Sequence, residues 1–257
     1  MHRKLLRSFA GLAVVTALLC DCNQSSDEML NLGVKYLLGK GVHQDYAKAR
    51  EWFQKAADAG EPQAIEDLGS MYMNGWGVTQ DYVKAREFFE RAAAAGCIGA
   101  VFNLGVLYEK GKGVPQDYAK ACEWYQKAAN AGAADALYHL GVMYQNGTGV
   151  AQDYDKAREL YQKAADAGDS DAMNNMGLLY KNGEGVTQDY ARAIEWFHKA
   201  VQASDALAMY NLGSLFEEGQ GVTKDLAKAR EWYQKAVDSG YDGAKQALAR
   251  LDSVQQP

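Results

Sequence analysis

The sequence predicts an all-α fold, a right-handed α/α superhelical solenoid of six 36-residue helix-turn-helix repeats followed by a C-terminal cap helix. Two observations support this prediction: one glycine returns every 36 residues, and a second pair of glycines follows it at a constant distance in every unit. A fixed period of this length marks a repeat protein, whose units bury their apolar faces by stacking on one another. The repeated glycines are Gly33, Gly69, Gly105, Gly141, Gly177 and Gly213.

The N-terminus carries the pattern of an export signal. Arg3, Lys4 and Arg7 precede an apolar run over residues 9–19. Eleven residues reach only about 16 Å as a helix, roughly half of a bilayer core. We therefore expect residues 1–22 to be a signal peptide. The alternative is a hydrophobic extension that packs on the first repeat.

Two cysteines near the end of this leader leave its processing open. Cys20 and Cys22 lie where a bacterial lipoprotein would carry its acylated cysteine, but Leu19 and Asp21 are poor fits to the small residue expected before such a site. Ordinary cleavage after Cys22 is the competing interpretation. A lipid at either cysteine would hold the protein at a membrane surface without spanning the membrane.

The second repeat shows how the first helix of each unit is built. Ala64, Leu68 and Tyr72 recur at the spacing of one helical face. Gly69 lies inside this helix, where glycine costs about 1 kcal/mol relative to alanine, so we expect a neighbouring helix to approach closely there. Gly75 then provides the backbone freedom to turn the chain.

The second helix of the unit has its own signals. Asp81 stands where an N-cap side chain would accept from free backbone N–H groups. Phe89, with Ala85 and Ala92 on the same stripe, is expected to be buried. Gly96 ends the helix and leads into the next unit.

These positions together resemble the Sel1-like repeat, a relative of the tetratricopeptide repeat, over roughly residues 27–252. The resemblance implies adaptor and scaffold roles with many different partners. Glu28 stands where later repeats have alanine, which fits a first repeat, and Ser204 replaces a terminal glycine, which predicts a weaker C-cap. We expect repeats at approximately 27–60, 61–96, 97–132, 133–168, 169–204 and 205–240, a cap helix at 241–252 and a tail at 253–257.

Composition and motifs argue against several other functions. The chain of 257 residues has a net charge of −6, with basic and acidic residues interleaved, so nucleic acid is not an expected partner. No zinc-binding His-Glu-x-x-His pattern, nucleophile elbow or Ser-x-x-Lys motif is present, although cysteine-rich relatives have been described as β-lactamases or penicillin binders. We predict no metal, no cofactor and no enzymatic activity. Cys97 and Cys122 should be about 12 Å apart along the hairpin, too far for a disulfide.

Candidate binding residues are those that vary within the repeat frame. By resemblance to tetratricopeptide folds, the first helices line a concave face, and the position three before each repeated glycine should point into it. Aromatic and amide side chains there suit contact with a peptide, although the aromatics could instead pack helix against helix. The predicted concave-face residues are Glu66, Phe102, Tyr138, Asn174 and Tyr210, with His139 beside them and Asn74, Asn146 and Asn182 one turn beyond the glycine.

Trp76 breaks the pattern in a different place. It lies between two turn glycines, where other repeats carry lysine, threonine, glutamate or glutamine. An exposed tryptophan there would be a candidate contact residue, whereas the alternative is that it folds back on its own repeat.

The sequence favours a non-enzymatic scaffold or adaptor of the bacterial cell envelope, periplasmic or envelope-associated, that binds a peptide or protein segment on its concave face. A secreted effector that engages host proteins is an alternative. The remaining alternative is an enzyme acting on cell-wall or β-lactam substrates. Membrane contact is expected only through a lipid at Cys20 or Cys22.

Overall fold

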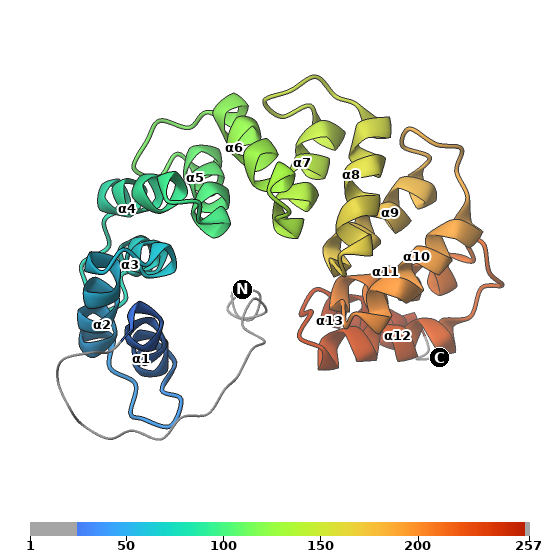
Figure 1. Cartoon of the computed structure of the whole chain (residues 1–257). Coiled ribbons are helices and arrows are strands. Elements are labelled where there is room, and N and C mark those ends of the chain that lie inside the picture. Colours follow the sequence, from blue (N-terminus) through green and yellow to red (C-terminus); the bar gives the residue numbers. More distant parts are fainter. Residues whose placement is uncertain (1–24, 255–257) are drawn as a thin grey trace.

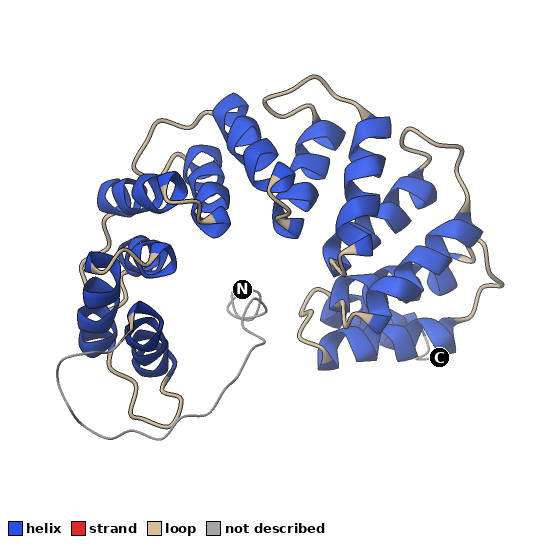
Figure 2. Cartoon of the chain, viewed as in Figure 1, coloured by secondary structure: helices blue, strands red, loops and turns tan. Residues whose placement is uncertain are grey.

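The computed structural model describes residues 25–254, which fold into thirteen helices and, within that range, no strand (Figure 2). The predicted signal peptide, with Cys20 and Cys22, lies outside the described residues, as do residues 255–257. The helices are α1 (Ser26–Leu38), α2 (Tyr46–Asp58), α3 (Pro62–Asn74), α4 (Tyr82–Ala94), α5 (Ile98–Lys110), α6 (Tyr118–Asn130), α7 (Ala134–Asn146), α8 (Tyr154–Asp166), α9 (Ser170–Asn182), α10 (Tyr190–Gln202), α11 (Ala206–Glu218), α12 (Leu226–Asp238) and α13 (Ala244–Val254).

The helices form hairpins that stack side by side into an open arc (Figure 1). Each hairpin pairs an odd-numbered helix with the even-numbered helix that follows it, from α1 with α2 to α11 with α12. In the first half of the arc, α1, α3 and α5 lie on the inner side of the curve and α2, α4 and α6 on the outer side (Figure 1). The predicted all-α solenoid of six repeats with a C-terminal helix is confirmed.

The helix ends follow the predicted capping chemistry. The Asp81 carboxylate accepts from the backbone N–H groups of Val83 and Lys84, at 3.1 and 3.0 Å. Gly75 ends α3 in the left-handed conformation, and its N–H donates to the carbonyl of Met71. The other five aspartates at this position cap their helices in the same way, namely Asp45, Asp117, Asp153, Asp189 and Asp225.

The repeated glycine lets the two helices of a hairpin touch. A Cβ added at Gly69 would lie 2.7 Å from the ring of Phe89, closer than carbon atoms can pack. At Gly105 the same clash would be with Tyr125, at 2.6 Å. The close approach predicted from Gly69 is therefore present, and its partner is the aromatic ring at the middle of the second helix.

Basic residues of the outer helices pack over aromatic rings of their own hairpin. Lys84 of α4 lies 5.4 Å from the centre of the Tyr72 ring, which also stacks on Phe88. Such cation–π contacts add about 0.5–1 kcal/mol at exposed sites. The same contact recurs as Lys48–Tyr36, Lys120–Tyr108, Lys156–Tyr144, Arg192–Tyr180 and Lys228–Phe216.

The two ends of the described stack are finished differently. Glu28 and Lys35 of α1 are exposed, whereas Ala64 and Met71 at the same positions of α3 are fully buried. At the other end, α13 buries Ala244 and Leu251 against α12, as expected of a cap helix. Polar terminal faces keep the ends of a solenoid soluble.

Other predicted features have the following outcomes. Ser204 adopts a φ of 65°, a left-handed conformation that serine tolerates less well than glycine. Cys97 and Cys122 are free thiols. Among the described residues, no helix has the length and apolar character needed to cross a membrane.

Candidate functional site

The predicted concave-face residues lie on the odd-numbered helices. We call the column formed by Glu66, Phe102, Tyr138, Asn174 and Tyr210 the ladder. Four of these side chains are half-buried, so each combines packing with access to solvent. Asn174 is the exception, because it is only 2% exposed.

Asn174 links two neighbouring repeats. Its side-chain oxygen accepts from the Asn211 amide of α11, at 2.7 Å. Asn103 of α5 makes the corresponding bond to Glu66 of α3, at 3.0 Å. In this structure Asn174 therefore joins α9 to α11 through its side-chain oxygen, and little of the residue is accessible to a partner.

Two ladder tyrosines pack within aromatic clusters while remaining half-exposed. The Tyr138 ring lies 5.6 Å from the His139 ring and 6.0 Å from the Tyr161 ring. Burial is the main cause that raises the pKa of Tyr138 above its ordinary value. The Tyr210 ring packs between Tyr233 and Tyr241, at 5.2 and 5.3 Å. These contacts agree with the alternative that the aromatics pack helix against helix, whereas their role in binding stays a prediction.

A second set of tyrosines supports the inner face from behind. The rings of Tyr125, Tyr161 and Tyr233 are buried over the repeated glycines of their hairpins. Each hydroxyl donates to the side chain sixteen residues earlier in the sequence. The acceptors are Glu109, Gln145 and Glu217, at 2.5, 2.7 and 2.6 Å respectively.

The remaining repeats lack both halves of this bond. Phe53, Phe89 and Phe197 take the place of the tyrosines, and the residues sixteen positions earlier are Leu37, Met73 and Lys181. The hydroxyl and its acceptor thus occur together or not at all. The inner face therefore contains two kinds of repeat, one with a phenol–acceptor bond and one without.

His139 stands at the centre of the most connected group on this face. Its ring stacks on Tyr125 at 4.9 Å and meets the edge of Phe102 at 5.3 Å. Its Nδ1 lies 3.5 Å from the Glu109 carboxylate. The hydrogen bond with His139 is the largest cause that lowers the pKa of Glu109 to about 2, and Lys110 and Tyr125 add to it against the effect of burial. Burial, followed by the bond to Glu109, raises the pKa of Tyr125.

The acidic residue of the last repeat is neutralised by the cap helix. Arg250 of α13 donates to both carboxylate oxygens of Glu217, at 3.0 and 2.7 Å. Burial acts to raise the pKa of Glu217, but the bonds from Arg250 and Tyr233 outweigh it and leave the pKa lowered.

Glu66 and Asp67 of the second repeat have no such countercharge. Glu66 accepts from Gln63, the Cys97 thiol and Asn103, which are all neutral donors. Asp67 has one buried carboxylate oxygen, Oδ2, with no hydrogen-bond partner. Burial, then the charge of Glu66, raises the pKa of Asp67 to about 7, against a lowering bond from Gln63. Burial and the bond to Glu66 also raise the pKa of Cys97 to about 12, so this thiol stays protonated and unreactive.

The predicted amides lie near the ends of the odd helices. Asn74 and Asn182 are exposed and already bonded, Asn74 to the Ser70 carbonyl and Asn182 to Glu184. Asn146 is exposed as well.

Trp76 is half-buried and stacks nearly parallel on Tyr46, with ring centres 6.4 Å apart. Tyr46 begins α2, so the tryptophan packs on the preceding repeat. Its ring stabilises the junction between the first two repeats and leaves less area for a partner than an exposed turn residue would.

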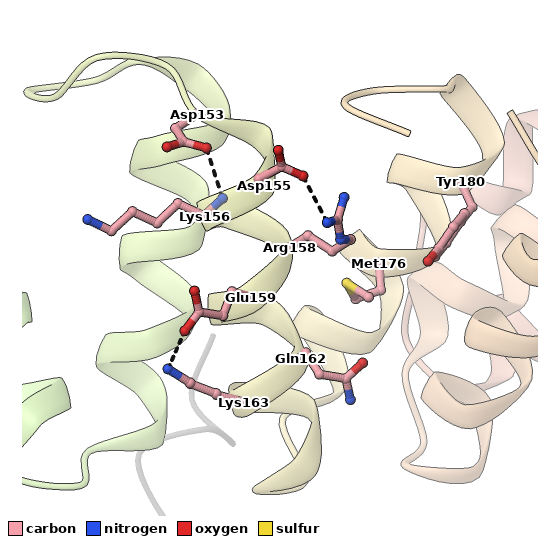
Figure 3. Close-up of a pocket in the computed structure, with 9 residues that line it drawn as sticks. All are labelled: Asp153, Asp155, Lys156, Arg158, Glu159, Gln162, Lys163, Met176 and Tyr180. Atoms are coloured by element: carbon pink, nitrogen blue, oxygen red, sulfur yellow. Dashed lines mark hydrogen bonds and ion pairs between the residues drawn. The ribbon is translucent and has the colours of Figure 1, made fainter. Parts of the chain in front are cut away.

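Two shallow grooves occur at equivalent places in the repeat frame. The larger, of about 730 Å³, lies between α8 and α9, beside the ion pairs Asp155–Arg158 and Glu159–Lys163 (Figure 3). The other occupies the same place between α2 and α3, three repeats earlier. Both result from the stacking of hairpins and show no arrangement of nucleophile and base. Within residues 25–254, no group of three or more metal-ligating side chains is positioned to hold a metal ion.

The repeat frame and its capping chemistry agree with one family model. The model described as the Sel1 repeat matches residues 29–61, 62–97, 98–132, 134–169, 170–205 and 206–241. The chain belongs to the Sel1 repeat family. Proteins of this family are commonly scaffolds for protein interactions, and their fold is typically non-enzymatic.

Solved structures support the same assignment. A Sel1 repeat protein from Oxalobacter formigenes is 35% identical, with a TM-score of 0.78, over 84% of this chain and 88% of its own. The c5321 protein, a protective antigen present in uropathogenic Escherichia coli strains, is 33% identical with a TM-score of 0.73 over 90% of this chain. The aligned region is only 50% of the c5321 chain. A putative Sel1 repeat protein from Klebsiella pneumoniae is 26% identical, with a TM-score of 0.54, over 79% of this chain and 99% of its own. Among curated proteins no sequence matches.

Sequence reasoning missed several residues of this Sel1 repeat protein that shape its inner face. Glu109, Gln145 and Glu217 were not singled out, although their co-occurrence with a tyrosine sixteen residues later is readable in the sequence. The lack of a hydrogen-bond donor for Asp67 is harder to find in the sequence. It depends on which side chains of the first repeat pack against Asp67, and this is known only once the stacking of the repeats is known.

Proposed function

We propose that this protein is a non-enzymatic scaffold that binds a peptide or protein segment along its inner face. The observation that supports this most is the half-buried, chemically varied ladder on a constant frame. The caps and glycines repeat with little change, whereas the ladder changes from glutamate to phenylalanine, tyrosine and asparagine. Tyrosines held by packing provide rigid contact area at little entropic cost.

The experiment is capture of partners by crosslinking and pulldown with the tagged full-length protein. We expect Tyr138→Ala and Tyr210→Ala together to weaken capture at least tenfold. Tyr118→Ala, which removes an exposed tyrosine from the outer helix α6, is the matched control. Thermal melts followed by circular dichroism check that all variants are folded. Equal capture by the inner-face and outer-face variants would rule out the inner face.

We further propose that the protein acts outside the cytoplasm, in the bacterial envelope. The basic and apolar N-terminal pattern supports export, and the related c5321 is described as a protective antigen. Mass spectrometry of the N-terminus of protein purified from cell fractions tests this. A mature chain that begins at Cys20 or Cys22 with added lipid mass would establish the anchored form. An uncleaved chain confined to the cytoplasm would overturn the proposal.

A further inference from the structure

The residue next to each ladder position contacts the preceding repeat. In the third to sixth repeats this contact is made to a polar or aromatic side chain. Asn175 donates to the Tyr161 hydroxyl at 3.2 Å, and His139 stacks on Tyr125. Asn103 and Asn211 face repeats whose second helix has phenylalanine, and both donate instead to the ladder residue before them, Glu66 and Asn174 respectively.

Asp67 occupies this position in the second repeat. The first repeat has no hydrogen-bond donor side chain at the corresponding partner positions. The residues of the first repeat at the two partner positions are Phe53 and Leu30, neither of which carries a polar side chain. The Asp67 Oδ2 atom is accordingly buried without a partner. An unpaired buried carboxylate oxygen is costly, so a structure normally supplies it with a donor.

Glu66 beside it adds a second negative charge. In the part of the chain that the structure describes, the ion pairs include none at Glu66 or Asp67. Glu109 and Glu217, by contrast, have His139 and Arg250. Glu66 and Asp67 are thus two adjacent, partly buried carboxylates without an ion pair.

Charged residues are distributed unevenly between the first and second helices of the hairpins. The odd-numbered helices α1 to α11 contain nine acidic and three basic residues, whereas the even-numbered helices α2 to α12 contain eleven acidic and sixteen basic residues. The basic residues early in the outer helices are held over aromatic rings. A positively charged segment is therefore favoured along the odd-numbered helices over the even-numbered ones.

We propose that Glu66 and Asp67 receive a lysine or arginine side chain of the segment bound on the inner face. This inference rests on the proposed scaffold function and names the chemistry of its partner. Asp67 is half-buried as a residue although its Oδ2 atom is buried, and the adjacent Glu66 is half-buried as well. Leu30, Val34 and Leu37 of α1 are also half-buried, and they provide apolar surface for the methylene stem of such a side chain.

A metal ion fits this place less well. Only two carboxylates are present, and the nearby thiol of Cys97 and the amides of Gln63 and Asn103 are already bonded to Glu66. An ammonium or guanidinium group needs only acceptors, which Asp67 offers in an unsatisfied form.

The test is selection of random twelve-residue peptides displayed on phage against the folded full-length protein. We expect the selected peptides to be enriched in lysine or arginine. Asp67→Asn should weaken the binding of such a synthetic peptide about tenfold, and so should replacement of its basic residue by norleucine. Glu87→Gln, which removes an exposed charge from the outer helix α4, should leave binding unchanged. Asp67→Asn removes a buried charge and keeps the side-chain shape, so it should remain folded.

The outcomes separate this inference from the function on which it rests. Peptides whose binding depends on Tyr138 and Tyr210, but which lack basic residues or bind Asp67→Asn equally well, would overturn the basic-residue site and leave the scaffold function standing. Failure to select any peptide that depends on the inner face would overturn both. An increase in the melting temperature with Mg²⁺ or Ca²⁺ alone, lost in Asp67→Asn, would assign the site to a metal ion instead.

Discussion

The third, fourth and sixth repeats have a tyrosine where the first, second and fifth have a phenylalanine, and their inner faces differ as a consequence. Each tyrosine hydroxyl donates to an acceptor on the first helix of its hairpin, such as Glu109 on α5. Each phenylalanine fills the same space over the repeated glycine but leaves that position free to be apolar or basic. The presence or absence of this hydroxyl on the second helix thus goes together with a polar or a non-acidic residue at the acceptor position of the first helix.

The same comparison explains why Asp67 is unusual. The repeat before it has Phe53 in place of the tyrosine and Leu30 at the position that corresponds to the ladder. Neither partner that serves the later repeats is therefore available to Asp67. The first two repeats therefore present apolar surface and uncompensated carboxylates, whereas the later ones present a satisfied network of phenols, amides and one imidazole.

The largest effect should come from the frame that both groups share. A Cβ at Gly141 would lie 2.5 Å from the fully buried Tyr161 ring. We expect Gly141→Ala to destabilise the protein by about 2 kcal/mol, because overpacking outweighs the gain of about 1 kcal/mol in helix propensity. Thermal melts measure this. The loss should shrink in a Tyr161→Ala background, and an alanine variant as stable as the parent would contradict the close-packing account.

The next effects come from Asp67 and Glu109, whose pKa values are shifted in opposite directions, so their contributions to stability change with pH in opposite directions. Burial raises the folded pKa of Asp67 from 3.8 to about 7, so ionisation increasingly destabilises the fold as pH rises through that range. Asp67→Asn, whose neutral amide is cheaper to bury, should stabilise by roughly 1–3 kcal/mol at pH 8. The gain should nearly vanish at pH 4. Melts at both values, with Glu87→Gln as control, test this; an equal gain at both would exclude the titration.

Glu109 should show the reverse dependence. Its folded pKa is lowered from 4.5 to about 2, so its contribution is complete above pH 4.5 and is lost as pH falls towards 2. Glu109→Gln should therefore destabilise at pH 6 and matter little near pH 2. A constant difference between these pH values in chemical denaturation would show that charge is not involved.

The smallest expected effect on stability comes from substitutions that convert a tyrosine repeat into a phenylalanine repeat. Tyr125→Phe should cost about 1.5 kcal/mol, because the half-buried Glu109 carboxylate loses a donor. Adding Glu109→Leu reproduces the pair that the first repeat already uses, Phe53 with Leu37, and should recover most of the loss. Denaturation of the two single variants and the double variant measures the coupling, and additive losses would mean that the phenol–acceptor bond is not the link.

Much of this molecule was predictable because it depends on short-range chemistry. The 36-residue period, the aspartate caps and the turn glycines act within a few residues of where they stand, so the solenoid and its hairpins follow from the sequence. The close approach at Gly69 was also predictable, since a helical glycine without a turn needs such a reason. The tyrosine–acceptor pairs could have been found from their constant spacing.

The functional surface was less predictable, because its state depends on contacts between repeats. Asn174 is hydrogen-bonded by Asn211, which lies 37 residues away, and Trp76 stacks on a tyrosine of the preceding repeat. Asp67 is polar and ordinary in the sequence, and only the stacking shows that Phe53 and Leu30 leave it without a donor. The sequence by itself determined the repeat, its caps and the identity of the ladder. The tertiary structure decided which ladder groups are already satisfied and which remain open to a partner, because hydrogen bonding and burial across a repeat junction depend on two units at once.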